Sequence, residues 1–200
     1  LFNHARNNSK DAFIRDNQYL IIAPTLHCAY TRATENTIVG ERNIGDARLN
    51  YDEQITKWFD LWLKGESNDF KEITPRVQYY TMGSNQWQFS NAWPPENTEM
   101  VTYYLNSSGN ANSRFGDGKL SRVKAKKDIP DNFTYDPMAP VPSYGGNVCC
   151  TGNAVKGGSW DQQDMEARND ILVYTTDILT QDTEVSGFIK SKLFVSSDVK

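Results

Sequence analysis

The spacing of the apolar residues changes completely near Pro75, and this change constrains the fold more than any other feature of the chain. Before Pro75 there is one continuously apolar run, at residues 19–23, and one segment with helical spacing. After Pro75 no segment keeps a helical period, and short β-rich runs alternate with turns rich in Gly, Asn, Asp and Pro. We therefore expect an α/β part followed by an all-β part within the 200 residues.

The first part contains one predicted strand and one predicted helix. The apolar run at residues 19–23 ends at Pro24, which is typical of a strand buried on both faces of a parallel sheet. Asn50 or Asp52 is suited to cap a helix, and Gly65 is suited to end it. Four apolar residues with i, i+3, i+4, i+7 spacing form one face of this helix: Ile55, Trp58, Phe59 and Trp62. We expect that face to pack against the sheet.

The second part is expected to be a β-sandwich or jelly roll. The predicted strands are residues 76–82, 101–105, 171–175 and 183–196. The last of these places Ile189 and Leu193 on a face that is better buried. Because no strand follows to cover that face, we expect the sandwich to be incomplete. Its order should then depend on a neighbouring polypeptide, either the remainder of the same protein or a second copy.

Charge and hydropathy exclude several classes of function. The 21 basic and 25 acidic residues give a net charge of −4 and lie scattered, so no nucleic-acid surface is expected. The longest apolar run is far shorter than the roughly 18 residues that span a bilayer, so no membrane segment is expected. The chain opens on Leu1 with no signal-peptide pattern. We expect this end to be a cut, which leaves the localisation open between the cytoplasm and export.

Neither a metal nor a cofactor is expected. The two histidines and three cysteines show no spacing that suits metal ligands. A disulfide between the adjacent Cys149 and Cys150 would close a strained ring, so reduced thiols are the expectation. These two residues are either thiol nucleophiles or small buried side chains, and the second use is favoured because no histidine lies near them in the sequence.

His27 is the candidate catalytic residue. It follows the predicted strand by a few residues, which places it in a loop at the carboxyl end of the strand, where sites in open α/β sheets lie. An imidazole can take and return a proton near neutral pH. The alternative is a partly buried histidine that donates a hydrogen bond to a backbone carbonyl. A Gly-x-Ser-x-Gly motif is absent, and Ser159 in Gly-Gly-Ser-Trp fits a loop serine.

Several segments, read in order, resemble the CocE/NonD serine hydrolases, a family that includes esterases, α-amino-acid ester hydrolases and X-Pro dipeptidyl-peptidases. The segment YLIIAPTLH resembles the strand and loop that carry the catalytic histidine of that family. The segment WFDLWLKG resembles a family helix, and MGSNQW followed by WP resembles the entry to its C-terminal β-domain. The remaining segments with this resemblance are residues 135–137, 140–146, 161–176 and 193–197.

The resemblance implies that the chain is part of an α/β-hydrolase with a Ser-His-Asp triad and a C-terminal jelly roll of the galactose-binding type. Residues 1–72 would be the C-terminal part of the hydrolase domain, and residues 73–200 a truncated jelly roll. Only His27 maps onto the triad. The serine would lie far upstream and the aspartate just before Leu1, so we expect the isolated chain to show no turnover. Ala23 and Thr25 replace the glycine and tryptophan of the family motif Gly-Pro-Trp-x-His.

The resemblance also implies the class of substrate. The expected substrates are small-molecule esters or amides, or short peptides of the X-Pro type, cleaved through an acyl-enzyme. Val148, Cys149 and Cys150 follow the Gly-Gly pair whose neighbourhood approaches the acyl pocket in esterase members. Their small side chains would leave room for a substrate other than an aryl ester.

A second hypothesis from a different class is a non-catalytic β-sandwich module that binds a carbohydrate or a partner surface. Trp87, Trp93 and nearby tyrosines would form its aromatic platform. Packing between the sheet and the first part of the chain is the alternative use of these tryptophans. The first seventy residues favour the enzyme, because a free-standing module needs neither a parallel strand nor a loop histidine.

Overall fold

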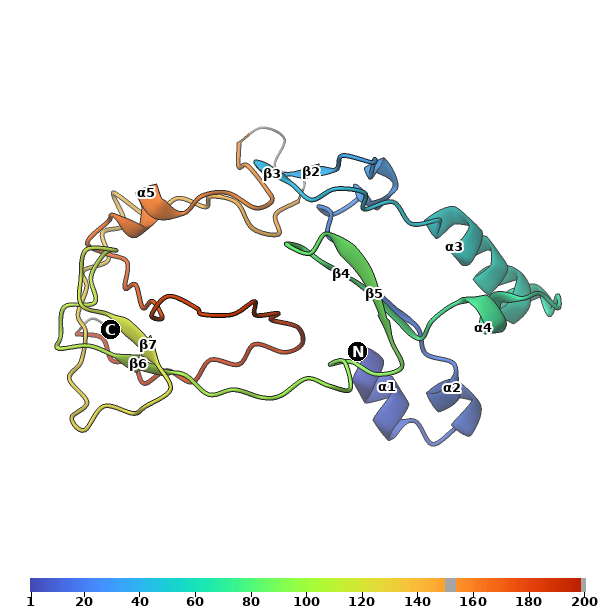
Figure 1. The fold of residues 1–200 in the computed structure, drawn as a ribbon, viewed down its shortest axis with the longest axis horizontal. Helices are drawn as coiled ribbons and strands as arrows, with labels where there is room; N and C mark the ends of the chain where they lie inside the picture. Colours follow the sequence, from blue (N-terminus) through green and yellow to red (C-terminus); the bar gives the residue numbers. More distant parts are fainter. Residues whose placement is uncertain (150–153, 199–200) are drawn as a thin grey trace.

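The computed structural model describes residues 1–149 and 154–198 and places most helices in the first third of the chain (Figure 1). The helical elements are α1 (Phe2–Asn8), α2 (Ala12–Asp16), η1 (Tyr30–Arg32), α3 (Tyr51–Phe59), η2 (Asp60–Lys64), α4 (Phe70–Ile73) and α5 (Gln163–Glu166). Of these, η1 is a 3-10 helix and η2 is a π-helical turn that continues α3.

The central sheet joins two segments that are distant in the sequence. Its three strands are β1 (Leu20–Ile22), β4 (Val77–Thr81) and β5 (Gln86–Ser90), in the order β1-β4-β5. β1 runs parallel to β4, with Leu20 opposite Val77, and β4 runs antiparallel to β5. The predicted parallel strand is therefore confirmed. The prediction that it is buried on both faces is wrong, because the middle strand β4 is the buried one and β1 is half-buried.

The helix predicted to end at Gly65 is confirmed, but most of its apolar face does not pack on the sheet. α3 is joined to the sheet at its beginning, where Tyr51 is buried and the Gln78 amide donates a 2.7 Å hydrogen bond to the Gln54 side chain. Farther along, α3 diverges from β4 and β5 (Figure 1). Trp58 and Phe59 are consequently 36% and 46% exposed, and their rings pack edge to face against each other.

The second part of the chain is mostly extended, with short antiparallel pairs. One such pair in this part is β6 (Tyr104–Asn106) with β7 (Lys119–Ser121), whereas the hairpin of β2 (Ile38–Val39) and β3 (Arg42–Asn43) belongs to the first part of the chain. The predicted strand at 76–82 is confirmed as β4, and the one at 101–105 overlaps β6. Residues 171–175 contribute only isolated bridges, from Leu172 to Asn112 and from Thr175 to Lys119.

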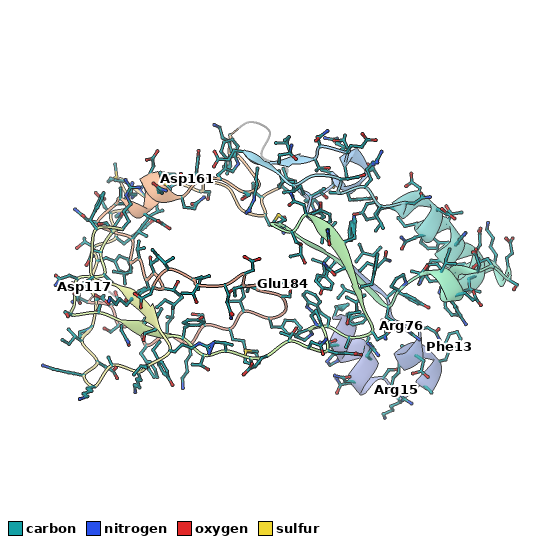
Figure 2. The ribbon with its side chains drawn as sticks, viewed as in Figure 1. Phe13, Arg15, Arg76, Asp117, Asp161 and Glu184 are labelled. Atoms are coloured by element: carbon teal, nitrogen blue, oxygen red, sulfur yellow. The ribbon has the colours of Figure 1, made fainter. Side chains whose placement is uncertain are left out.

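The predicted long strand at residues 183–196 is wrong. This segment forms no ladder with any described residue, so it has no hydrogen-bonded partner strand that would fix it as a strand. Its expected better-buried face is solvent-exposed, with Ile189 88% and Leu193 59% exposed. One contact to the sheet is a 3.4 Å hydrogen bond from the Thr81 hydroxyl to Glu184, whose position is marked in Figure 2.

The two parts of the chain are joined by backbone pairing at the β2-β3 hairpin. The Glu41 amide donates to the Ser159 carbonyl at 3.0 Å, and the Ser159 amide donates to the Val39 carbonyl at 3.3 Å. The Asp161 amide adds a 2.6 Å hydrogen bond to the Glu41 carboxylate. These contacts require a close approach of the backbones at Gly40, where a Cβ atom would lie 2.2 Å from the Ser159 carbonyl oxygen.

Asp131 ties together three segments of the second part. One carboxylate oxygen accepts hydrogen bonds from the Tyr174 hydroxyl at 2.6 Å and the Ser107 hydroxyl at 2.7 Å, and the other accepts from the Ala111 amide at 2.9 Å. Burial raises the pKa of Asp131, but the three hydrogen bonds together outweigh burial and bring its pKa below the ordinary value of 3.8. Burial and the neighbouring Asp131 carboxylate raise the pKa of Tyr174.

We expect Tyr174→Phe to reduce the free energy of unfolding by about 1–2 kcal/mol at pH 7, the range for a partly exposed hydrogen bond to a charged group. Because the folded pKa of Asp131 is depressed, its contribution is fully present well above pH 3.8 and is lost as the pH falls through the folded pKa. The difference between the variant and the wild type should therefore shrink in acid. Urea denaturation at pH 7 and pH 3 measures it. Tyr135→Phe, at a 62% exposed tyrosine, is the control.

We expect Gly40→Ala to destabilise the protein more than Gly45→Ala. Both glycines have positive φ, +71° and +73°, so both variants carry the backbone strain of a left-handed alanine, about 1 kcal/mol. Only at Gly40 must the Ser159 backbone also move, since the nearest atom to a Cβ on Gly45 is 3.5 Å away. Hydrogen exchange of the Glu41 and Ser159 amides should accelerate in Gly40→Ala alone. Equal effects of the two variants would show that the pairing at the hairpin contributes nothing.

Candidate active-site loop

The loop after β1 presents His27 to solvent. β1 ends at Ile22, and residues 27–28 form a turn, so His27 lies in a loop after the strand as predicted. His27 is exposed, and its imidazole forms no hydrogen bond with the residues that the structure describes. Cys28, also exposed, has a φ of +60°. The structure thus shows an accessible imidazole at the carboxyl end of a parallel strand, and not a buried histidine bonded to a carbonyl.

Leu26 anchors the loop immediately before His27. Its side chain packs against the core cluster of Val39, Ile44, Ala47 and Tyr80, to which Trp87 also contributes. The Leu26 carbonyl accepts a 3.0 Å hydrogen bond from the Ala29 amide, which closes the turn. His27 therefore projects from a backbone that is fixed on its amino side by hydrophobic packing.

Gly157 brings the second part of the chain against this loop. A Cβ atom on Gly157 would lie 3.0 Å from the Val148 side chain and 3.1 Å from the Leu26 side chain. Val148 is half-buried at this contact, and Cys149 next to it is exposed. Of the three predicted pocket residues, Val148 thus lies beside the anchor of the His27 loop. Cys150 lies outside the described residues.

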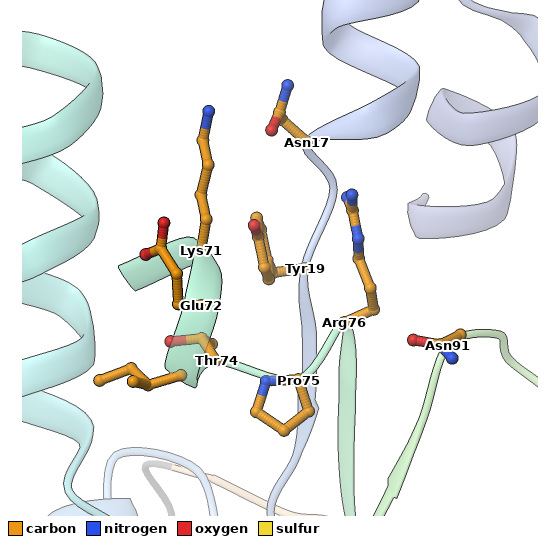
Figure 3. Close-up of a pocket in the computed structure, with 9 residues that line it drawn as sticks. Asn17, Tyr19, Lys71, Glu72, Thr74, Pro75, Arg76 and Asn91 are labelled. Atoms are coloured by element: carbon orange, nitrogen blue, oxygen red, sulfur yellow. The ribbon is translucent and has the colours of Figure 1, made fainter. Parts of the chain in front are cut away.

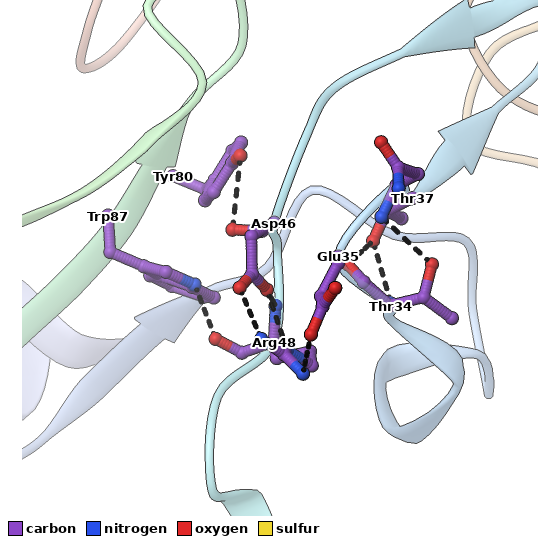
Figure 4. A network of polar contacts seen from close by, with 8 residues as sticks. Thr34, Glu35, Thr37, Asp46, Arg48, Tyr80 and Trp87 are labelled. Atoms are coloured by element: carbon purple, nitrogen blue, oxygen red, sulfur yellow. Dashed lines mark hydrogen bonds and ion pairs between the residues drawn. The ribbon is translucent and has the colours of Figure 1, made fainter.

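A polar network fixes the segment that follows the loop to the sheet (Figure 4). The Tyr80 hydroxyl donates to the Ile44 carbonyl, and the Trp87 indole donates to the Arg48 carbonyl at 3.0 Å. Arg48 pairs with Asp46 at 2.6 Å and with Glu35 at 3.1 Å. Its hydrogen bonds lower the pKa of Asp46. These exposed ion pairs set local geometry more than stability.

The tryptophans of the binding-module hypothesis are used in packing. Trp87 lies 5.4 Å from Tyr80 and 6.4 Å from Tyr51, and Trp93 lies 5.3 Å from Tyr79, all measured between ring centroids. Burial raises the pKa of Tyr51 to about 12, so this phenol stays neutral. The structure therefore agrees with the packing interpretation of Trp87 and Trp93 and provides no exposed aromatic platform from them.

Two hollows lie at the opposite edge of the sheet from His27. One, of about 350 Å³, lies at the amino ends of β1 and β4, beside Tyr19 and Arg76 (Figure 3). A neighbouring hollow of about 380 Å³ includes Arg6 and Arg15. Because β1 and β4 are parallel, their carboxyl and amino ends are at opposite edges of the sheet. These hollows therefore do not form a pocket for His27.

Residues 1–149 and 154–198 contain no group of three or more His, Cys, Asp or Glu side chains placed to hold a metal ion. In the same residues, no helix is both long enough and apolar enough to cross a bilayer.

The match to a known family covers most of the chain. Residues 68–200 match the family described as the X-Pro dipeptidyl-peptidase C-terminal non-catalytic domain. Cocaine esterase from Rhodococcus sp. is 36% identical over 140 residues, which are 70% of this chain and 24% of that protein. A Mycobacterium bovis protein, provisionally named a serine esterase, is 25% identical over 171 residues, 78% of this chain and 23% of its own length.

The fold is also similar to a solved structure. The crystal structure of an aminopeptidase from a marine sediment archaeon of the Thaumarchaeota matches with a TM-score of 0.55 and 24% identity, over 80% of this chain and 25% of that one. The chain thus belongs to the X-Pro dipeptidyl-peptidase C-terminal domain family. Together with these relatives, it is a member of the CocE/NonD family of hydrolases, with a β-rich C-terminal domain. It spans about a quarter of the length of the relatives that it matches.

Sequence reasoning missed Leu26 and Gly157, which connect the His27 loop to the second part of the chain. The sequence signal for this contact is the Gly157-Gly158 pair, because adjacent glycines indicate that another segment approaches the backbone closely. The pair does not indicate which segment that is.

We expect Gly157→Val to displace Leu26 and with it the His27 ring, because its branched side chain would overlap both Val148 and Leu26. The His27 imidazole resonances should shift in NMR spectra of selectively labelled protein. Gly65→Ala is the control: its φ of +72° brings backbone strain, but no atom lies within 4 Å of its Cβ position and it lies outside the pairing around Gly157. Unchanged His27 resonances in Gly157→Val would show that the contact does not position the loop.

Proposed function

We propose that this chain supplies the general-base loop and the C-terminal β-domain of a serine hydrolase that cleaves carboxylic-ester or amide bonds, including those of X-Pro peptides. The observation that carries this proposal is the accessible His27 at the carboxyl end of β1, anchored by Leu26. The esterase and peptidase relatives of the chain support the assignment to the hydrolases.

In the proposed mechanism His27 accepts the proton of a serine hydroxyl as that oxygen attacks the substrate carbonyl. The imidazolium then donates the proton to the leaving alcohol or amine, which leaves an acyl-enzyme. The same imidazole activates a water molecule that hydrolyses the acyl-enzyme and regenerates the serine. The serine and the aspartate that orients the histidine are proposed to come from outside this sequence.

The C-terminal domain is proposed to shape the acyl pocket without taking part in the chemistry. Val148 and the exposed Cys149 are the described residues proposed to line it, together with Cys150. The family description calls the matched domain non-catalytic, and His27 lies before its first matched residue, 68. A catalytic His27 and a non-catalytic domain at residues 68–200 are therefore compatible.

We expect His27→Ala, made in the complete protein that carries this chain, to lower kcat/KM for a p-nitrophenyl ester by about 10⁴-fold to 10⁶-fold, because a serine without its base is a poor nucleophile. His4→Ala is the matched control, since His4 is the other histidine of the chain and lies exposed on α1. It should retain wild-type activity. Circular dichroism verifies that both variants fold. Folded His27→Ala with activity within tenfold of the wild type would contradict the proposal.

A further inference from the structure

The hollow at the amino ends of β1 and β4 has a polar, cationic lining. Lys71 of α4 and Arg76, just before β4, contribute the positive charges, and Tyr19 contributes a phenol. Glu72 is the single carboxylate among the nine lining residues (Figure 3). In that view the side chains of Lys71, Tyr19 and Arg76 extend in the same direction, with Tyr19 between the two cations.

Both cations are held in place without a carboxylate. The Arg76 guanidinium lies 5.2 Å from the centre of the Tyr19 ring and donates a hydrogen bond to the Asp16 carbonyl. The Lys71 ammonium lies 4.6 Å from the centre of the Trp62 ring. Neither forms an ion pair with any residue that the structure describes, although seven ion pairs occur elsewhere in that part of the chain.

The Tyr19 and Trp62 rings already hold the two long cationic side chains. Less side-chain entropy is therefore lost when a ligand binds to them. An arginine guanidinium has five donors in a planar fork, and a carbonyl and a ring face leave part of that fork unused. The second hollow beside this one adds Arg6 and Arg15, which likewise donate to backbone carbonyls, those of Asn91 and Ser9. It also adds the carboxylate of Asp16, so the two linings together hold four cations and two carboxylates. Figure 2 shows Arg15 and Arg76 at the same corner of the molecule. This corner is therefore positive in a chain whose net charge is −4.

We propose that this hollow binds a small oxyanion, a phosphate or carboxylate group, between Lys71 and Arg76, with the Tyr19 hydroxyl as a neutral donor. The site is separate from the His27 loop and does not depend on the proposed hydrolase activity. The two cations and the phenol are hydrogen-bond donors, and the oxygens of a phosphate or carboxylate group are acceptors. A guanidinium can donate to two of those oxygens at once.

The test measures how fast Lys71 is acetylated by an amine-reactive ester in the complete protein, quantified by mass spectrometry. Inorganic phosphate should slow the reaction of Lys71 at least threefold and saturably, while sodium chloride at matched ionic strength should not. Lys127, an exposed lysine of the second part, should react at an unchanged rate. Acetate is tested as a third salt. If the site takes carboxylates, acetate and phosphate should both protect Lys71; if it takes phosphates, phosphate should protect it and acetate should do so only weakly.

Arg76→Gln should abolish the protection of Lys71 by phosphate. Arg122→Gln is the matched control, because Arg122 also lies over a tyrosine ring, that of Tyr103 at 5.4 Å, but far from the hollow in the sequence. If circular dichroism shows that Arg76→Gln is unfolded, Tyr19→Phe replaces it and should weaken the protection at least twofold. Protection that equals the chloride effect, or that survives intact in folded Arg76→Gln, would overturn the proposal.

Discussion

The parallel pairing of β1 with β4 is the interaction on which the rest of the structure depends. Two parallel neighbours cannot be joined by a tight turn, so the chain between them must return from the carboxyl edge of the sheet to its amino edge. That return path carries the His27 loop, the β2-β3 hairpin and α3, and it ends at α4 beside the start of β4. The pairing therefore determines that the accessible imidazole and the cationic hollow occupy opposite edges.

The His27 loop adjoins both parts of the chain. Leu26 packs on the core of the first part, and it lies beside Gly157 and Val148 of the second part. The same hairpin that contributes Val39 to this core also pairs with Ser159 through the backbone. The second part of the chain thus helps to determine where the His27 loop lies.

The sequence predicted the elements whose evidence is local. The apolar run at residues 19–23 and the spacing from Ile55 to Trp62 each lie within one element, and both were confirmed. The prediction of a strand at residues 183–196 was wrong. Alternating apolar and polar residues show only that a segment can pair, and a strand also needs a partner to pair with. His27 was placed correctly after its strand. Its anchor Leu26 was not found, because the contact with Gly157 joins residues that are far apart in the chain.

The π-helical turn at Asp60–Lys64 gives the helix two rotational phases. The Gly65 amide donates to the Asp60 carbonyl, five residues back, so the turn holds more residues than an α-helical turn. Since each residue of an α-helix advances by about 100°, the side chains after the turn are rotated relative to those before it. Trp62, inside the turn, meets Phe13 of α2 at 5.1 Å, while Trp58 contacts only its own neighbour Phe59 among the ring contacts of the described residues. One continuous apolar pattern in the sequence therefore reaches another helix at the turn and remains half-exposed before it.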